Sequence, residues 1–271
     1  MPELPDVAIQ KQYLDATALH APIVDVIVKS KKIIKGVSAR RFRSALVGAE
    51  FASSSTYGKY LFVALENNRK SQREWLMLHF GMTGFLEYGK ERFGADDSSE
   101  QKHARLEVTF RNGYHLSFVN KRLLGKASLI ESPESFIEKK RLGPDAMKIA
   151  IEHFRTIVSE HSAAIKSTLM NQKYICGLGN VYTDEILYHS GIHPERKSDG
   201  LSEDEVSTLY EAMHEVVAIA IEHKADPSKM PDDFLLPHRE EGETCPRCRG
   251  TIEKIKVNGR STYVCPACQK R

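Results

Sequence analysis

The sequence predicts an α+β protein in three parts: a β-sandwich over residues 1–130, a helical region over 131–223, and a small cysteine-bracketed hairpin over 245–271. Short β-rich runs separated by turn residues fill the first part and favour packed sheets. Segments of helical periodicity fill the second part. Two pairs of cysteines bracket the third. A chain of 271 residues is long enough to bury two separate cores.

The strands of the first part are predicted from four apolar or alternating runs, at residues 23–28, 60–65, 75–80 and 104–110. After the last run, Asn112 and Gly113 predict a two-residue hairpin turn. The segments 67–74 and 89–103 are polar and are predicted to be loops. Many short strands with turns between them are typical of a β-sandwich.

The helices of the second part are predicted over residues 132–140, 149–161, 163–170 and 180–191, and from Ser202 onward. Ser132 and Pro133 are an N-cap and a first helical residue. Ser202 and Glu205 predict a capping box at the start of the last helix. The apolar side chains of that helix repeat at helical spacing and are predicted to lie in the core. Residues 224–244 are rich in proline and charge and are predicted to be a linker.

Charge and composition limit the possible partners and locations. A net charge of +3 and a pI near 8.5 permit an anionic partner such as nucleic acid. No run approaches the roughly 18 apolar residues of a membrane span, and the first residues lack the apolar region of a signal peptide. We therefore expect an intracellular protein without a membrane partner.

The cysteines Cys245, Cys248, Cys265 and Cys268 form two C-x2-C pairs with sixteen residues between them. This spacing predicts a tetrahedral four-thiolate site for one Zn²⁺. Four thiolates leave no open coordination position, so the ion would be structural. Disulfides or unreactive thiols are the alternatives. Cys176 lies apart and is predicted to pack as a small apolar side chain.

Between the two cysteine pairs, two short strands are predicted to meet at Asn258 and Gly259 in a type I′ turn. Arg260 follows the turn, and Lys254 and Lys256 lie on the preceding strand. A metal-braced hairpin with a cationic tip is suited to contact phosphates, although cations at hairpin tips are commonly only solvated.

The N-terminus begins Met-Pro-Glu, so removal of Met1 would expose the secondary amine of Pro2 beside the carboxylate of Glu3. Together with Lys59 in "YGKYL", the stretch "CGLGNVYTDEIL" and the ending "GRSTYVCPACQK", this terminus resembles the formamidopyrimidine-DNA glycosylase / endonuclease VIII family. The similarity runs nearly end to end and is closer to the formamidopyrimidine branch. It implies a β-sandwich, a helix–two-turn–helix domain over residues 131–223 and a C-terminal zinc finger.

The resemblance implies a bifunctional DNA glycosylase and AP-site lyase of base-excision repair. Pro2 would attack C1′ of a damaged nucleotide while Glu3, as general acid, protonates the sugar ring oxygen; β,δ-elimination from the Schiff base would then cut the strand. Lys59 would contact a phosphate beside the lesion and assist elimination, and Arg260 would clamp the flanking phosphates. A fraying terminus and an ordinary exposed lysine are the alternative interpretations.

The resemblance also implies DNA contacts from the rest of the chain. Lys166 and Asn180 match phosphate-binding positions of the helix–two-turn–helix domain, and the glycines of "GLGN" would let backbone N–H groups approach a phosphate. His103 matches a DNA-contacting histidine, with a solvated loop histidine as the alternative.

Three side chains in the family fill the gap that a flipped nucleotide leaves. Met82 and Arg122 match two of them, whereas Leu124 replaces the usual aromatic residue. The chain reads "NKRLLG" at 120–125 where the formamidopyrimidine branch typically reads D-P-R-R-F-G. Residues 224–244 also lack the longer glycine-rich loop of that branch. We therefore expect a preference for ring-opened purines, oxidised pyrimidines or AP sites over 8-oxoguanine.

The expected partner is double-stranded damaged DNA, bound by a monomer in a bacterial-type cytoplasm at the nucleoid. Two alternatives remain for the activity: an AP-site lyase with little base excision, and a non-catalytic damaged-DNA-binding protein of the same fold.

Overall fold

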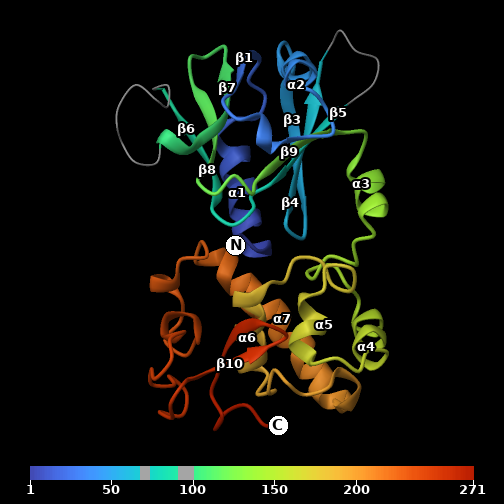
Figure 1. The fold of residues 1–271 in the computed structure, drawn as a ribbon, viewed down its shortest axis with the longest axis vertical. Helices are drawn as coiled ribbons and strands as arrows, with labels where there is room; N and C mark the ends of the chain where they lie inside the picture. The colour runs from blue at the N-terminus through green and yellow to red at the C-terminus, as the bar shows by residue number, and fades with distance from the viewer. Residues whose placement is uncertain (68–73, 91–100) are drawn as a thin grey trace. The chain divides into compact units, whose positions relative to one another are not determined.

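The computed structural model describes residues 1–67, 74–90 and 101–271 and divides into two compact units. Unit 1 comprises Met1–Pro2 and Asp6–Lys140, and unit 2 comprises Glu3–Pro5 and Arg141–Arg271 (Figure 1). Most of the two predicted polar loops, at 67–74 and 89–103, lies outside the described residues. Within the described ranges, no helix combines the length and the apolar character that crossing a membrane requires.

Unit 1 is a sandwich of a four-stranded sheet, in the order β1-β7-β8-β6, and a five-stranded sheet, in the order β2-β9-β5-β4-β3. All described pairings are antiparallel except that of β2 with β9. The predicted sandwich and its four predicted strands are therefore confirmed. The strands are β1 (Ile23–Val28), β2 (Ile34–Lys35), β3 (Glu50–Tyr57), β4 (Tyr60–Glu66), β5 (Glu74–His79), β6 (Gly84–Gly89), β7 (Ala104–Phe110), β8 (His115–Asn120) and β9 (Lys126–Ile130).

Two helices were not predicted from the sequence: α1 (Leu4–Thr17), which belongs to unit 1 from Asp6 onward, and α2 (Ala39–Leu46) in unit 1. Along α1 the fully buried apolar residues Val7 and Leu14 are seven residues apart, which is too sparse a pattern to indicate a helix. In α2 the Ser38 side chain accepts a hydrogen bond from the backbone N–H of Arg41, so this short helix has an N-cap. A third helix, α3 (Pro133–Lys140), forms where the sequence predicted a helix; it belongs to unit 1, whereas the sequence analysis assigned it to the helical part over 131–223.

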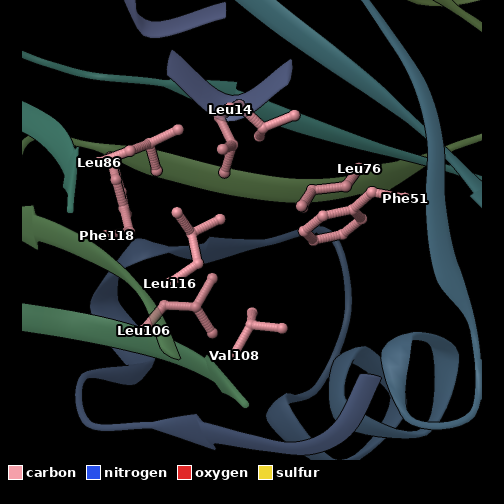
Figure 2. Close-up of a pocket in the computed structure, with 9 residues that line it drawn as sticks. Leu14, Phe51, Leu76, Leu86, Leu106, Val108, Leu116 and Phe118 are labelled. Carbon is pink, nitrogen blue, oxygen red and sulfur yellow. The ribbon is translucent and has the colours of Figure 1, made fainter. Parts of the chain in front are cut away.

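The interior of the sandwich contains a small pocket between α1 and the two sheets. Figure 2 shows the side chains that line it, and all of them are apolar. Because no polar group is present to orient a ligand, the pocket is a packing void in the core. Its lining residues are Leu14, Phe51, Leu76, Leu78, Leu86, Leu106, Val108, Leu116 and Phe118.

The hairpin between β7 and β8 forms, but the predicted two-residue turn is wrong. Phe110 N donates to Tyr114 O, which closes a three-residue loop over 111–113, and Gly113 alone has a left-handed φ of 84° in this turn. The Asn112 side chain accepts a hydrogen bond from Tyr114 N, so Asn112 caps the loop rather than entering the left-handed region. The result is a turn followed by a glycine bulge.

Unit 2 contains the predicted helices α4 (Ile151–Ser159), α5 (Ile165–Met170), α6 (Asn180–His189) and α7 (Glu203–Glu222), and the hairpin strands β10 (Glu253–Val257) and β11 (Arg260–Val264). Both hydrogen bonds of the predicted capping box on α7 are present. Asn258 and Gly259 have φ values of 46° and 75°, which confirms the type I′ turn.

The segment at 224–244 is packed against the helices of unit 2, although the sequence predicted only a linker. Phe234 and Leu235 are 2% and 0% exposed, and Met230 is also buried. The side-chain carboxylate of Glu185 accepts hydrogen bonds from the backbone N–H groups of Leu235 and Leu236. These contacts fix the segment between α7 and the cysteine hairpin.

Candidate functional site

Glu3 is buried, at 2% exposure, and caps the N-terminus of α6. Its carboxylate accepts hydrogen bonds from the backbone N–H groups of Gly179, Val181 and Tyr182 at 2.8, 3.0 and 3.2 Å. A Cβ atom on Gly179 would lie 2.3 Å from this carboxylate, so only glycine permits the approach. The N–H groups and the helix dipole stabilise the ionised form of Glu3.

The prediction that the glycines of "GLGN" bring N–H groups to a phosphate is therefore wrong for these three groups, because they bind Glu3. Pro2 precedes Glu3 directly and follows an exposed Met1. Once Met1 is removed, the fixed carboxylate is one residue away from a free secondary amine. The two groups predicted to begin the chemistry are thus held together by the chain itself.

Lys166, for which a phosphate contact is predicted, forms a buried ion pair in the structure. Lys166 is 1% exposed, and its Nζ donates to Asp184 Oδ1 at 2.5 Å and to Thr262 Oγ1 at 2.7 Å. Asp184 accepts two further hydrogen bonds from the guanidinium of Arg239. Burial lowers the pKa of Lys166 and raises the pKa of Asp184, and the contact between the two groups opposes both shifts. Lys166 therefore joins α5, α6 and β11.

Asn180 and Arg260 lie on two elements that a hydrogen bond connects. Asn180 begins α6, and its Nδ2 donates to Ser261 O at 2.9 Å. The turn residue Asn258 donates to the Ser167 hydroxyl, which attaches the hairpin to α5 as well. Arg260 is exposed, and its side chain has no hydrogen bond or ion pair to the part of the chain that the structure describes. A fixed hairpin thus presents a guanidinium that is available to an anion.

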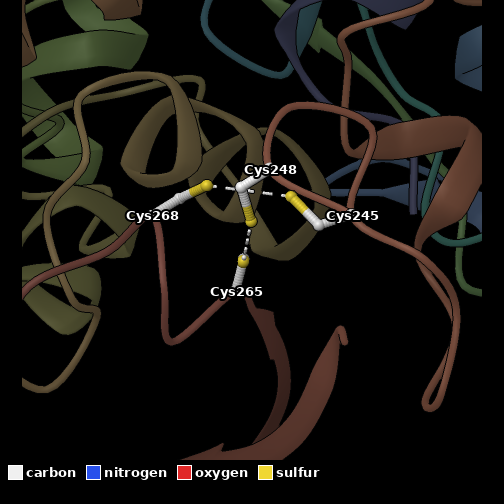
Figure 3. Close-up of side chains that lie close together, drawn as sticks. All are labelled: Cys245, Cys248, Cys265 and Cys268. Carbon is white, nitrogen blue, oxygen red and sulfur yellow. Dashed lines mark hydrogen bonds between the residues drawn. The ribbon is translucent and has the colours of Figure 1, made fainter. Parts of the chain in front are cut away.

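The four cysteine sulfur atoms lie within 4.8 Å of one another (Figure 3). Cys245 and Cys268 are 3.7 Å apart and Cys248 and Cys265 are 3.4 Å apart, far beyond a disulfide bond of about 2.05 Å. Four thiolates about 2.3 Å from a tetrahedral ion would lie about 3.8 Å apart. The site therefore fits one structural Zn²⁺. The hydroxyl of Tyr188 lies 3.1 Å from the Cys245 sulfur.

Lys59 lies at the tip of the β3–β4 hairpin in unit 1. Gly58 has a φ of 53° and makes the tight turn that joins the paired residues Tyr57 and Tyr60. The Lys59 side chain is 5% exposed, which excludes the interpretation of an ordinary exposed lysine. The hairpin tip thus holds a cationic side chain in a buried and defined position.

His79 was missed by the sequence analysis, which treated it as the end of an apolar strand. Its ring lies 5.1 Å from that of Tyr60, and its Nδ1 accepts a hydrogen bond from Gly81 N at 3.2 Å. Burial, followed by the charges of Lys126 and Lys59, lowers the pKa of His79 to about 4. A neutral imidazole therefore links the Lys59 hairpin to the loop after β5. The sequence did contain an indication of this role, because His79 is a polar residue between an apolar strand and the glycine-containing stretch "GMTG".

The predicted gap-filling residues lie on two adjacent loops of unit 1. Met82 and Leu124 are 38% and 47% exposed, and Arg122 is also exposed. A Cβ atom on Gly81 would lie only 2.5 Å from the backbone of Leu124, which shows how closely the loops pack. His103 is half-buried, and its Nδ1 lies 3.0 Å from the guanidinium of Arg105, so it is not a freely solvated loop histidine.

Three family models match the chain in the order of these elements. Residues 1–127 match the formamidopyrimidine-DNA glycosylase N-terminal domain, residues 142–232 match its H2TH domain, and residues 242–271 match a zinc finger found in FPG and IleRS.

Relatives and solved structures agree with this match over the whole chain. The formamidopyrimidine-DNA glycosylase of Solibacter usitatus is 33% identical over 282 residues, covering 100% of both chains. That of Streptococcus pyogenes is 30% identical over 285 residues, covering 100% of this chain and 99% of the relative.

The crystal structure of Lactococcus lactis Fpg (MutM) with DNA containing N7-benzyl-Fapy-dG has a TM-score of 0.87 at 26% identity, covering 100% of both chains. A structure of MutM with DNA containing carbocyclic 8-oxo-G has a TM-score of 0.87 at 25% identity, with the same coverage. The chain therefore belongs to the formamidopyrimidine-DNA glycosylase family, the DNA glycosylases of base-excision repair that also have AP lyase activity.

Proposed function

We propose that this protein removes oxidised or ring-opened bases from double-stranded DNA through a Schiff base at Pro2 and then cleaves the strand by β,δ-elimination. The observation that carries the proposal is the buried carboxylate of Glu3, fixed by three backbone N–H groups one residue after Pro2. A role in binding alone would not require a fixed acid beside an N-terminal amine.

The first step needs a neutral amine at Pro2 and a protonated carboxyl at Glu3. Transfer of one proton from the Pro2 ammonium to the Glu3 carboxylate supplies both. The amine then attacks C1′, and the bond from C1′ to the ring oxygen breaks as Glu3 protonates that oxygen. The proton that the attacking nitrogen still carries is transferred to the base, and the bond from C1′ to the base breaks as the iminium forms. The resulting iminium accepts the electrons of the C2′–H bond when that proton is removed, and the 3′-phosphate leaves. A second elimination then releases the 5′-phosphate.

Other residues bind the DNA in this proposal. The buried Lys59 contacts a phosphate beside the lesion and assists elimination, and the exposed Arg260 clamps the flanking phosphates. Lys166 acts indirectly, because its ammonium is bound to Asp184 and Thr262. The remaining DNA contacts come from His103, Asn180, Met82, Arg122 and Leu124.

We propose that 8-oxoguanine is a poorer substrate than ring-opened purines, oxidised pyrimidines or AP sites. Selecting 8-oxoguanine over guanine requires several well-placed hydrogen bonds around the flipped base. Residues 224–244, which would have to supply such a loop, bury Phe234 and Leu235 in the core of unit 2 instead. Leu124 also presents no aromatic face to the opposite base. The same substitution supports the second candidate, an AP-site lyase with little base excision.

We also propose that the protein acts as a monomer in the cytoplasm, at the nucleoid. Its relatives in Solibacter usitatus and Streptococcus pyogenes are bacterial, and they match it over their full length. Its proposed substrate is genomic DNA.

The test combines borohydride trapping with single-turnover excision on matched duplexes that contain 8-oxoguanine, a formamidopyrimidine, dihydrouracil or an AP site. We expect a covalent adduct at Pro2, mapped by mass spectrometry, and the slowest excision on 8-oxoguanine. The matched control is the same protein with an uncleaved N-terminal extension. This control keeps every side chain, but its Pro2 nitrogen is part of a peptide bond and is not a free amine. Glu3→Gln should abolish base removal while retaining part of the AP-site cleavage.

An adduct at Lys59 would disprove the assignment of the nucleophile. Cleavage of AP sites without excision of any base would establish the lyase candidate, and binding without an adduct would establish a non-catalytic protein. Fastest excision of 8-oxoguanine would refute the proposed substrate preference.

A further inference from the structure

We infer that Asn120 is a positioning residue that fixes Met82 and Leu124 as one rigid apolar wedge for opening the DNA base stack. The inference rests on the proposed function, in which these two side chains fill the gap left by the flipped nucleotide. It concerns unit 1 alone and follows from the hydrogen bonds of a single buried amide.

Asn120 is the last residue of β8 and is fully buried, at 0% exposure. Its Nδ2 donates to Phe80 O at 2.9 Å, and its Oδ1 accepts from Gly125 N at 3.1 Å. Phe80 begins the loop that carries Met82, and Gly125 ends the loop that carries Leu124. One side chain thus ties both loops together, and each partner requires a different end of the amide.

Glycines surround this amide and let the two loops meet backbone to backbone. A Cβ atom on Gly84 would lie 2.3 Å from Phe80 O and 2.8 Å from Asn120 Nδ2. A Cβ atom on Gly125 would lie 2.9 Å from the same nitrogen. Since the space around the amide is filled, the loops cannot shift past one another without breaking its hydrogen bonds.

The two loops that Asn120 connects carry exposed apolar side chains, which indicates that their fixed arrangement has a function. Among the described residues, the large apolar side chains with high exposure are Met1, Val24, Met82 and Leu124. Met82 and Leu124 lie on the two loops that Asn120 joins. An apolar wedge separates two stacked bases only if it stays in position while the bases unstack. Loops that are already ordered before DNA binds also lose less conformational entropy on binding.

The two hydrogen bonds of the side chain give a matched test. Asn120→Ala removes both of them, and so breaks the links to the Met82 loop and to Gly125 without adding a charge. Asn120→Asp, which introduces the residue of the branch motif at this position and keeps an acceptor for Gly125 N, is the control and should slow excision less than alanine does. Arg105, which donates to the backbone carbonyl of Asn120, keeps its contact in either case.

We expect Asn120→Ala to slow single-turnover excision of a base-paired lesion about tenfold, the effect of losing buried hydrogen bonds. Cleavage of a preformed AP site should change less than about twofold, because no paired base has to leave the stack. The fluorescence of 2-aminopurine beside the lesion should report slower flipping. In a Met82→Ala, Leu124→Ala background, Asn120→Ala should have no further effect on excision.

Equal excision by wild type and Asn120→Ala would overturn the inference, as would equal slowing on both substrates or an effect that persists in the wedge-deleted background. If Asn120→Ala does not fold, Asn120→Ser, whose side chain is too short to reach both Phe80 O and Gly125 N, undergoes the same assays. A wild-type protein that excises no lesion would refute the proposed function instead, so the two failures are distinguishable.

Discussion

His79 is neutral in the folded protein because its site disfavours the proton. Its imidazole packs against Tyr60 and accepts a hydrogen bond from Gly81 N, while the charges of Lys126 and Lys59 lie nearby. The pKa is lowered from 6.5 to about 4 by burial first and by these lysines second. The unfolded chain therefore binds more protons than the folded chain between these two values.

Lowering the pH from 6.5 towards 4 should consequently destabilise unit 1 through His79, by up to about 3 kcal/mol of unfolding free energy. The contribution of His79 to the unfolding free energy is complete above its pKa in the unfolded chain. This contribution is lost as the pH falls to its pKa in the folded protein. The measurement is urea unfolding followed by the fluorescence of Trp75, the single tryptophan, which lies on β5. A His79→Gln variant with the same pH dependence as wild type would contradict the assignment.

Burial is the residue property that the sequence predicted least well. Pro2, Glu3 and the cysteines are adjacent or regularly spaced, so their pattern predicts a common role. Lys166 is different: its ammonium is buried only because Asp184 and Thr262, which are distant in sequence, fold against it. No local pattern around Lys166 distinguishes such a lysine from one that contacts phosphate.

Helix α6 contacts several functional parts of unit 2. Its N-terminus binds Glu3, Asp184 binds Lys166 and the hairpin, Glu185 binds the backbone at 235–236, and Tyr188 reaches Cys245. The sequence predicted this helix, which is buried along Tyr182–Tyr188. The partners of its polar side chains are distant in the sequence, so a local residue pattern could not identify them. For the same reason the sequence did not predict that residues 224–244 pack against unit 2.

Replacement of Tyr188 by Phe should weaken zinc binding about 10- to 100-fold, the usual effect of losing a hydrogen bond to a metal ligand. A zinc-bound thiolate carries no proton, so the Tyr188 hydroxyl must donate to Cys245 at their separation of 3.1 Å. The guanidinium of Arg247 lies 5.4 Å from the Tyr188 ring and fixes that ring further. The measurement is competition for zinc with a metal-binding dye.

The control for this prediction is Tyr210→Phe, which removes the hydroxyl that donates to Ile149 O in the helical core, outside the cysteine cluster. Tyr210→Phe should leave the zinc affinity unchanged. Equal affinities for wild type and both variants would show that the Tyr188 hydroxyl does not support the metal site.

Across the whole molecule, the sequence predicted the sandwich, the helices from α3 onward and the hairpin because each has its own periodicity or spacing. The structure gives each unit a separate apolar core, around Phe51 and Phe118 in unit 1 and around Phe154 and Leu209 in unit 2. The cysteine module forms a third cluster in which Tyr188 and Leu235 pack against Cys245 and Cys265. These clusters predict that the metal stabilises one part of the chain selectively.

Removal of zinc with a chelator should therefore loosen unit 2 while leaving the sandwich folded. Loss of the metal removes the cross-link among the four cysteines, and β10 and β11 then rely on the bonds of Asn180, Lys166 and Asp184. Hydrogen exchange should rise in residues 245–271, and the thermal transition reported by Trp75 should shift by less than about 2 °C. The same chelator with a Cys176→Ser variant is the control, since Cys176 lies outside the cluster. If the Trp75 transition fell together with protection of the hairpin, the two units would unfold as one, and the metal would stabilise the entire molecule.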